Sequence, residues 1–144
     1  MSKRIKQISL SEFAVLLRVA RQIHTDRNEP IPELGQDNWL KIEYALQAPF
    51  QYTFGVTPYR GFLKKACVQF YLIAKGHRLS NGNKRMACIT LDYFCFINGK
   101  TLIISDDDLV VLARNTADSD AQKMEDCLEY VQAVLKNSIV DRTQ

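Results

Sequence analysis

The sequence lacks an apolar run of the roughly 18 residues that a membrane-spanning helix needs, so we expect no membrane segment. It also lacks a secretory signal pattern, because the basic residues 1–7 lead into a polar, charge-bearing segment. Internal repeats and low-complexity stretches are absent as well. These absences predict a cytoplasmic protein that folds as an ordinary globular chain.

A strong excess of charge of one sign is also missing. The 19 basic and 16 acidic residues give a formal net charge of +3, and the pI is about 8.7. The sequence contains no basic stripe interleaved with aromatic residues, which is the pattern that single-stranded nucleic acid favours. We therefore expect no nucleic-acid partner.

The spacing of the four cysteines excludes the usual metal motifs. Cys67, Cys88, Cys95 and Cys127 form no CxxC pair, and no histidine follows them at zinc-finger spacing. All four lie in apolar stretches of helical pattern, where a reduced cysteine behaves as a small hydrophobic residue. The prediction is four buried free thiols and no structural zinc.

The composition provides enough hydrophobic material for one core. The chain has 144 residues, of which 47% are hydrophobic and 24% charged, and this predicts a single domain over residues 1–144. Apolar residues recur at helical spacing along most of the chain. The sequence therefore predicts an all-α domain of about six helices, over residues 10–24, around 39–46, 58–75, 86–97, 105–115 and around 124–135.

Segment 86–97 is apolar on almost every side, so we expect it to be the buried central helix. Asn98 and Gly99 predict its C-terminal end. Ser105 predicts the N-terminal cap of the next helix. Trp39 lies in an apolar helical stripe and is expected in the core.

The stretch between the two longest predicted helices carries the most chemistry. It leads into a helix N-terminus, whose amides and positive dipole end attract anions, and Gly82 allows close approach of the backbone. Lys84 and Arg85 fall in the first turn, where cations are unfavourable unless an anion is present. The pattern favours a phosphate site, and a solvated basic turn is the alternative.

In full, this stretch is His77-Arg78-Leu79-Ser80-Asn81-Gly82-Asn83-Lys84-Arg85. It resembles the signature of the Fic/Doc superfamily (filamentation-induced-by-cAMP and death-on-curing proteins), His-x-Phe-x-(Asp/Glu)-Gly-Asn-(Gly/Lys)-Arg. The resemblance covers about residues 43–99. It implies a single-domain Fic fold, in which helices surround a buried central helix and a short β-hairpin forms a flap.

The resemblance implies a role for each matched position. His77 corresponds to the general base that takes a proton from a protein hydroxyl, and the structural alternative is a histidine that satisfies a helix end. Arg85 corresponds to the arginine that holds nucleotide phosphates. The implied catalytic residues are His77, Lys84 and Arg85. The implied nucleotide- and phosphate-binding residues are Asn81, Gly82, Asn83, Lys84 and Arg85.

Stretch 51–57 is β-prone but too short to found a sheet, and 102–104 is expected to be a short extended piece. By resemblance the first corresponds to the flap, which pairs with an extended segment of the target protein. The implied docking residues are Tyr52, Thr53, Phe54 and Gly55. The alternative places Tyr52 and Phe54 in the core.

Lys84 stands where nucleotidyl-transferring Fic proteins carry glycine. Lysine there resembles the death-on-curing branch, in which the nucleotide is held reversed and the γ-phosphoryl group of ATP is transferred. The implied function is that of a toxin that phosphorylates a protein hydroxyl, such as a threonine of elongation factor Tu, and stops translation. Transfer of an AMP group to a protein hydroxyl is the alternative.

Asn81 stands where an acidic residue of the family binds Mg²⁺. A neutral amide oxygen is a poorer ligand for this cation, so the implied metal role of Asn81 is weak. The competing interpretation makes Asn81 the N-cap of the following helix. The neutral side chain of Asn81 also leaves open a third function, a degraded module that binds anions without catalysis.

Many Fic proteins carry an inhibitory helix with a Ser/Thr-x-x-x-Glu-Gly/Asn motif. The nearest match here is 25–29, but Pro30 and Pro32 follow it and would interrupt a helix. By resemblance we therefore expect a separate antitoxin. His24, just before this stretch, ends a predicted helix and is expected to be structural.

Overall fold

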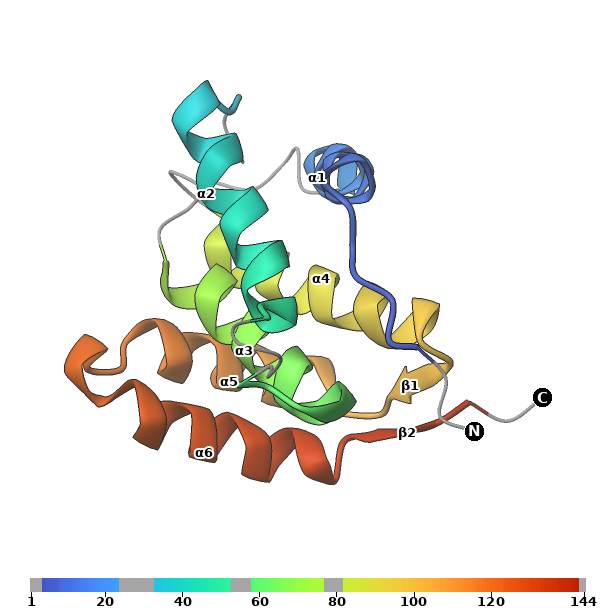
Figure 1. The fold of residues 1–144 in the computed structure, drawn as a ribbon, viewed down its shortest axis with the longest axis vertical. Coiled ribbons are helices and arrows are strands. Elements are labelled where there is room, and N and C mark those ends of the chain that lie inside the picture. Colours follow the sequence, from blue (N-terminus) through green and yellow to red (C-terminus); the bar gives the residue numbers. More distant parts are fainter. Residues whose placement is uncertain (1–3, 24–32, 53–57, 77–81, 143–144) are drawn as a thin grey trace.

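The computed structural model describes residues 4–23, 33–52, 58–76 and 82–142 (Figure 1). Over these residues the all-α prediction is confirmed. The helices are α1 (Leu10–Ile23), α2 (Gln36–Gln47), α3 (Gly61–Lys75), α4 (Asn83–Ile97), α5 (Asp106–Ala117) and α6 (Met124–Lys136). The shorter elements are η1 (Ala48–Phe50), η2 (Ala121–Lys123), β1 (Lys100–Leu102) and β2 (Ile139–Asp141). None of the described helices is long and apolar enough to cross a membrane.

Helices α3 and α4 form the centre of the molecule and share its most extensive helix–helix contact. Phe62, in the first turn of α3, stacks on Phe94, near the end of α4, so the two helices run antiparallel. Helix α5 packs against both α3 and α4, and α6 packs against α3; both lie below the pair, and α2 lies above it (Figure 1). The C-terminal end of α3 and the N-terminal end of α4, which residues 76–82 join in the sequence, therefore lie at the same side of the core.

Burial is more complete in α3 than in α4. Every residue from Lys65 to Tyr71 is buried, whereas α4 leaves Asp92 and Phe96 exposed. The prediction that 86–97 would be covered on all sides is therefore too strong. One large apolar residue of α4 lies at the surface, since Phe96 is 61% exposed.

An aromatic cluster holds the end of the α3–α4 pair that lies away from the connection. The ring centroids of Phe62 and Phe94 are 4.8 Å apart, and Phe50 meets Phe94 edge-on at 6.2 Å. Lys65 lies with its ammonium 5.3 Å from the centroid of Phe50 and donates to the carbonyl of Tyr59. Burial lowers the pKa of this lysine, because desolvation disfavours its charged form.

Helix α3 begins at Gly61 and not at Pro58, where the sequence predicted its start. Arg60 is extended (φ −82°, ψ 139°) and Gly61 has φ +81°, so the chain turns immediately before the helix. A positive φ is readily adopted only by glycine. Gly61, and not Pro58, therefore decides where α3 starts.

Other local predictions are confirmed. Ser105 caps α5 by accepting a hydrogen bond from the Asp108 amide at 3.1 Å, and Gly99, with φ +70°, follows the end of α4. The expectation that Trp39 lies in the core is met only in part, since Trp39 is half-buried and packs against the border of the core.

The strand pair and the N-terminal segment meet at the C-terminal end of α4. Strand β1 pairs antiparallel with β2, with Thr101 opposite Val140. The sequence predicted an extended piece at 102–104, two residues later than β1, and did not predict β2. Asn98 accepts from the amide of Lys6 at 2.7 Å and donates to its carbonyl at 3.1 Å, which fixes the N-terminal segment beside this sheet.

Truncation of the central aromatic residue tests this description of the core. Phe94 is fully buried, so Phe94→Ala should lower the free energy of unfolding by about 3–5 kcal/mol. Phe96→Ala, two residues along the same helix, removes an exposed ring and should cost less than about 1 kcal/mol. Urea denaturation followed by circular dichroism compares the two. Equal losses would contradict the assignment of Phe94 to the core.

Candidate anion-binding site at the start of α4

The first turn of α4 is positioned by a glycine in a left-handed conformation. Gly82 has φ 86° and ψ 12°, and its carbonyl accepts a hydrogen bond from the Met86 amide at 2.9 Å. A side chain at this backbone conformation would be strained. Glycine therefore allows the chain to enter the helix by a sharp turn that directs the first helical amides outward from the helix end.

The electrostatics of this turn favour a negatively charged ligand. It contains no acidic residue, and both Lys84 and Arg85 lie in it. Cations near the positive end of a helix dipole are unfavourable by about 0.3–1 kcal/mol each, and a bound anion reverses the sign of that interaction. The Lys84 side chain is exposed, while those of Asn83 and Arg85 are half-buried.

Four residues of the predicted site are thus brought together in one turn: Gly82, Asn83, Lys84 and Arg85. His77 and Asn81 lie outside the described residues, as does His24, so their predicted roles stay predictions. Lys84 and Arg85 each place a positively charged side chain at the start of the helix. The arrangement can hold a phosphate group through backbone amides and two cations.

The flap prediction is only partly covered by the structure. Thr53, Phe54 and Gly55 lie outside the described residues. Tyr52 is described and its side chain is 71% exposed, so the alternative that placed Tyr52 in the core is wrong. Its role in docking a target protein stays a prediction.

A lysine that sequence reasoning did not single out fixes the neighbouring helix end. Lys75, in the last turn of α3, donates to the carbonyl of Ala117 at 3.1 Å and to that of Ser119. The Gly76 amide also closes α3 by donating to the Leu72 carbonyl at 3.0 Å. A cation in a last turn is a recognisable helix-end signal, but its two acceptors, at the end of α5 and just after it, could not be read from the sequence.

The donors at this site suit a phosphate better than a bare cation. The described first turn of α4 offers amides and positive side chains, which repel a metal ion. Among residues 4–23, 33–52, 58–76 and 82–142, no group of three or more His, Cys, Asp or Glu residues could hold a metal ion. The described first turn of α4 therefore offers a divalent cation no carboxylate ligand.

Comparison with protein-family models identifies this chain. The model of the Fic/DOC family matches residues 5–95, more than half of the sequence. The chain belongs to the Fic/DOC family. Comparisons with curated proteins and with solved structures found no match.

The Fic/DOC match is wider than the resemblance recognised in the sequence. It begins at residue 5 and so includes α1, whereas the sequence resemblance began near residue 43. It ends at Cys95, before the strand pair, α5 and α6. Proteins of the Fic/DOC family are in general protein-modifying transferases that use a nucleoside triphosphate, usually with Mg²⁺.

The thiols of Cys67, Cys88 and Cys95 should be chemically inert in the folded protein. Burial raises the pKa values of Cys67, Cys88 and Cys95 to about 12, because an apolar environment disfavours the thiolate. We expect these three positions to resist Ellman's reagent at pH 8 in the native protein and to react on unfolding in urea. Mass spectrometry of the labelled peptides identifies the positions, and rapid native labelling of Cys88 would contradict this prediction.

Proposed function

We propose that this protein is a phosphotransferase of the death-on-curing type, a toxin that moves the γ-phosphoryl group of ATP to a hydroxyl of another protein. The observation that carries the proposal is the basic first turn of α4 behind left-handed Gly82, at the position of the family signature. Lys84 supports this branch, because nucleotidyl-transferring members have glycine there. The proposed target is elongation factor Tu, and its modification would stop translation in the cytoplasm.

In the proposed reaction His77 takes the proton from the target hydroxyl as the oxygen attacks the γ-phosphorus. The new oxygen–phosphorus bond forms while the bond to the ADP oxygen breaks, and ADP leaves with the electron pair. Arg85 and the first amides of α4 neutralise the phosphate charge that develops. Lys84 holds the nucleotide in the reversed orientation that presents its γ-phosphate to His77.

Mg²⁺ is proposed to accompany ATP and to reduce the charge on its phosphates. Asn81 is neutral, so it would contribute weakly to holding this ion. The same residue supports a second candidate function, a degraded module that binds anions without transfer. Transfer of an AMP group to a protein hydroxyl is the third candidate.

Two protein partners belong to the proposal. The target would dock along the flap residues Tyr52, Thr53, Phe54 and Gly55, and the exposed ring of Tyr52 is compatible with such a contact. A separate antitoxin would restrain the activity, since Pro30 and Pro32 disfavour an inhibitory helix within this chain.

One labelling experiment distinguishes the three candidate functions. The protein is incubated with a bacterial lysate and with ATP that carries the label either on the γ-phosphate or on the adenine ring. Label on protein from γ-labelled ATP alone supports phosphoryl transfer. Label from adenine-labelled ATP alone indicates AMP transfer, because the γ-phosphate then leaves in pyrophosphate. No label from either form, with ATP still bound, supports the degraded module.

Removal of the proposed base should abolish transfer and retain the fold. His77→Ala should lower the transfer rate by about 10²–10⁴-fold, because the target hydroxyl then lacks its proton acceptor. His24→Ala, at the only other histidine, is the matched control and should stay close to wild type. Circular dichroism verifies folding of both variants. Near-wild-type transfer by a folded His77→Ala protein would contradict the role.

Lys84→Gly should abolish transfer of the γ-phosphoryl group and allow some AMP transfer, since the lysine is proposed to hold the reversed nucleotide. Lys64→Gly is the matched control, because Lys64 is an exposed lysine in the first turn of α3. The control should retain γ-phosphoryl transfer. The two labelled forms of ATP are used to measure both activities. Unchanged phosphorylation by Lys84→Gly would show the orientation to be set elsewhere.

A further inference from the structure

A groove runs along the C-terminal end of α4, away from the anion-binding turn. Its larger part, about 950 Å³, lies between the N-terminal segment and the end of α4, and its smaller part, about 340 Å³, lies between α4 and β1. Phe96 and Arg142 line both parts, so they form one continuous surface. Phe96 follows Gly82 by 14 positions along the helix, which places the groove roughly 20 Å from the candidate anion-binding turn.

The floor of this groove is the Phe96 ring, and contacts with Arg142 hold it in position. The Phe96 ring is 61% exposed, and the guanidinium of Arg142 lies 4.8 Å from its centroid. Arg142 also donates to the carbonyl of Phe96 at 2.9 Å. Ile89 and Leu16 extend the apolar lining toward α1. An aromatic ring presented in this way is a typical anchor for a partner's side chain.

One wall of the groove is an open strand edge. The amide of Ile103 donates to the Ser138 carbonyl at 2.7 Å, and the amide of Arg142 donates to the Gly99 carbonyl at 2.8 Å. Backbone groups alternate in direction along a strand, so those of Lys100 and Leu102 point away from β2. In the part of the chain that the structure describes, β1 has no partner strand on that side.

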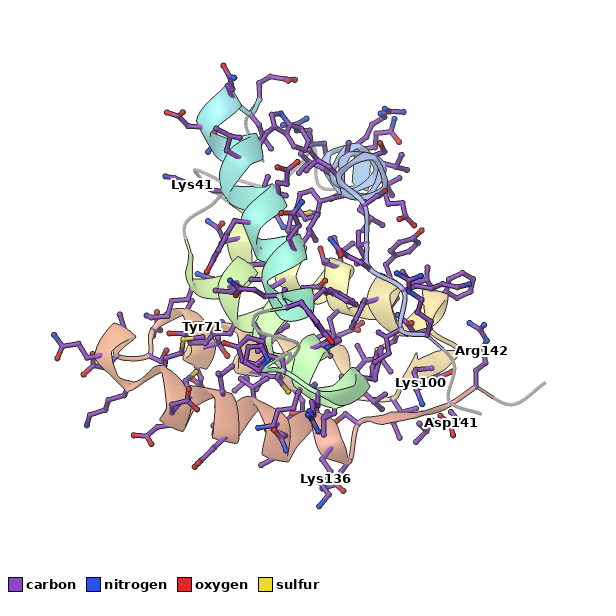
Figure 2. All side chains as sticks on the ribbon, viewed as in Figure 1. Lys41, Tyr71, Lys100, Lys136, Asp141 and Arg142 are labelled. Atoms are coloured by element: carbon purple, nitrogen blue, oxygen red, sulfur yellow. The ribbon has the colours of Figure 1, made fainter. Side chains whose placement is uncertain are left out.

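The charges around the groove favour an acidic occupant. Arg4, Lys6 and Arg142 line it, against Glu12 and Asp92. Lys100 already pairs with Asp141 at 2.5 Å, at the end of the molecule where Arg142 also lies (Figure 2). Apart from this ion pair, the charged side chains that line the groove carry a net positive charge.

One of the two opposing carboxylates is already engaged. Glu12 accepts a hydrogen bond from the Tyr93 hydroxyl and another from the Ser9 amide at 2.9 Å. These hydrogen bonds, that from Tyr93 foremost, lower the pKa of Glu12 and keep it ionised. Glu12 and Asp92 therefore offset part of the charge of the three cations, and the groove keeps a net positive charge.

We infer that an acidic, extended segment of a separate protein binds here by adding a third strand to β1. The segment's backbone would pair with Lys100 and Leu102, alternate apolar side chains would rest on Phe96, and its carboxylates would meet Arg4, Lys6 and Arg142. A small molecule would leave the strand edge unpaired, and a helical peptide offers it no backbone partners. This interaction goes beyond the proposed transfer and needs no catalysis, so its failure would leave the proposed function intact.

Selection from a displayed library of random 12-residue peptides against the full chain tests this inference. We expect enriched sequences that alternate acidic and apolar residues, and at least tenfold weaker binding to Phe96→Ala and Arg142→Glu. Val110→Ala and Arg114→Glu, at exposed positions of α5, are the matched controls and should bind as wild type does. No enrichment, a basic consensus, or equal binding to all four variants would overturn the inference.

Backbone pairing is tested with the strongest selected peptide. N-methylation at alternate residues should lower its affinity at least tenfold in one register and leave it nearly unchanged in the other, since only every second amide faces β1. Hydrogen exchange of the Lys100 and Leu102 amides should slow when the peptide binds. Insensitivity to N-methylation would overturn strand addition. A dimer in analytical ultracentrifugation that Phe96→Ala abolishes would identify a second copy of this chain as the occupant instead.

Discussion

The antiparallel packing of α3 against α4 determines where the rest of the molecule lies. Phe62 on Phe94 fixes one end of this pair, with Phe50 against the same ring. At the other end only residues 76–82 separate the two helices, so the basic first turn of α4 must lie near the last turn of α3. The core is not purely apolar: Gln69 and Thr90 are buried, and their side-chain polar atoms make no hydrogen bond. Such groups cost about 1–3 kcal/mol each, which the surrounding apolar burial must exceed.

The family signature and this packing together explain the character of the anion-binding turn. A glycine with positive φ starts the helix, and the first turn carries two cations and no acid. In an isolated helix this charge distribution would be a local fault, whereas at a phosphate site it is favourable. Local features that disfavour folding and favour a ligand are expected at functional sites.

Much of the fold could be predicted from the sequence because its signals are local. The caps and stops at Ser105 and Gly99, and the apolar spacing of α1 and α6, depend only on nearby residues. Strand β2 could not be predicted, because three residues form a strand there only through a partner far away in the chain. For the site, the signature identified 82–85, but the acceptors of Lys75 arise from tertiary packing that no local pattern records.

The contact of Lys75 has a consequence for how much of this chain is needed. The family match ends at residue 95, yet Lys75 is tied to carbonyls at Ala117 and Ser119, beyond that limit. The C-terminal helices therefore support the part of the chain that the family model matches. A chain cut after the matched region would lose both carbonyls that hold Lys75. The last turn of α3, which precedes His77 in the sequence, would then be less well fixed. Substitutions in α5 can therefore shift the last turn of α3 without altering any residue of the signature.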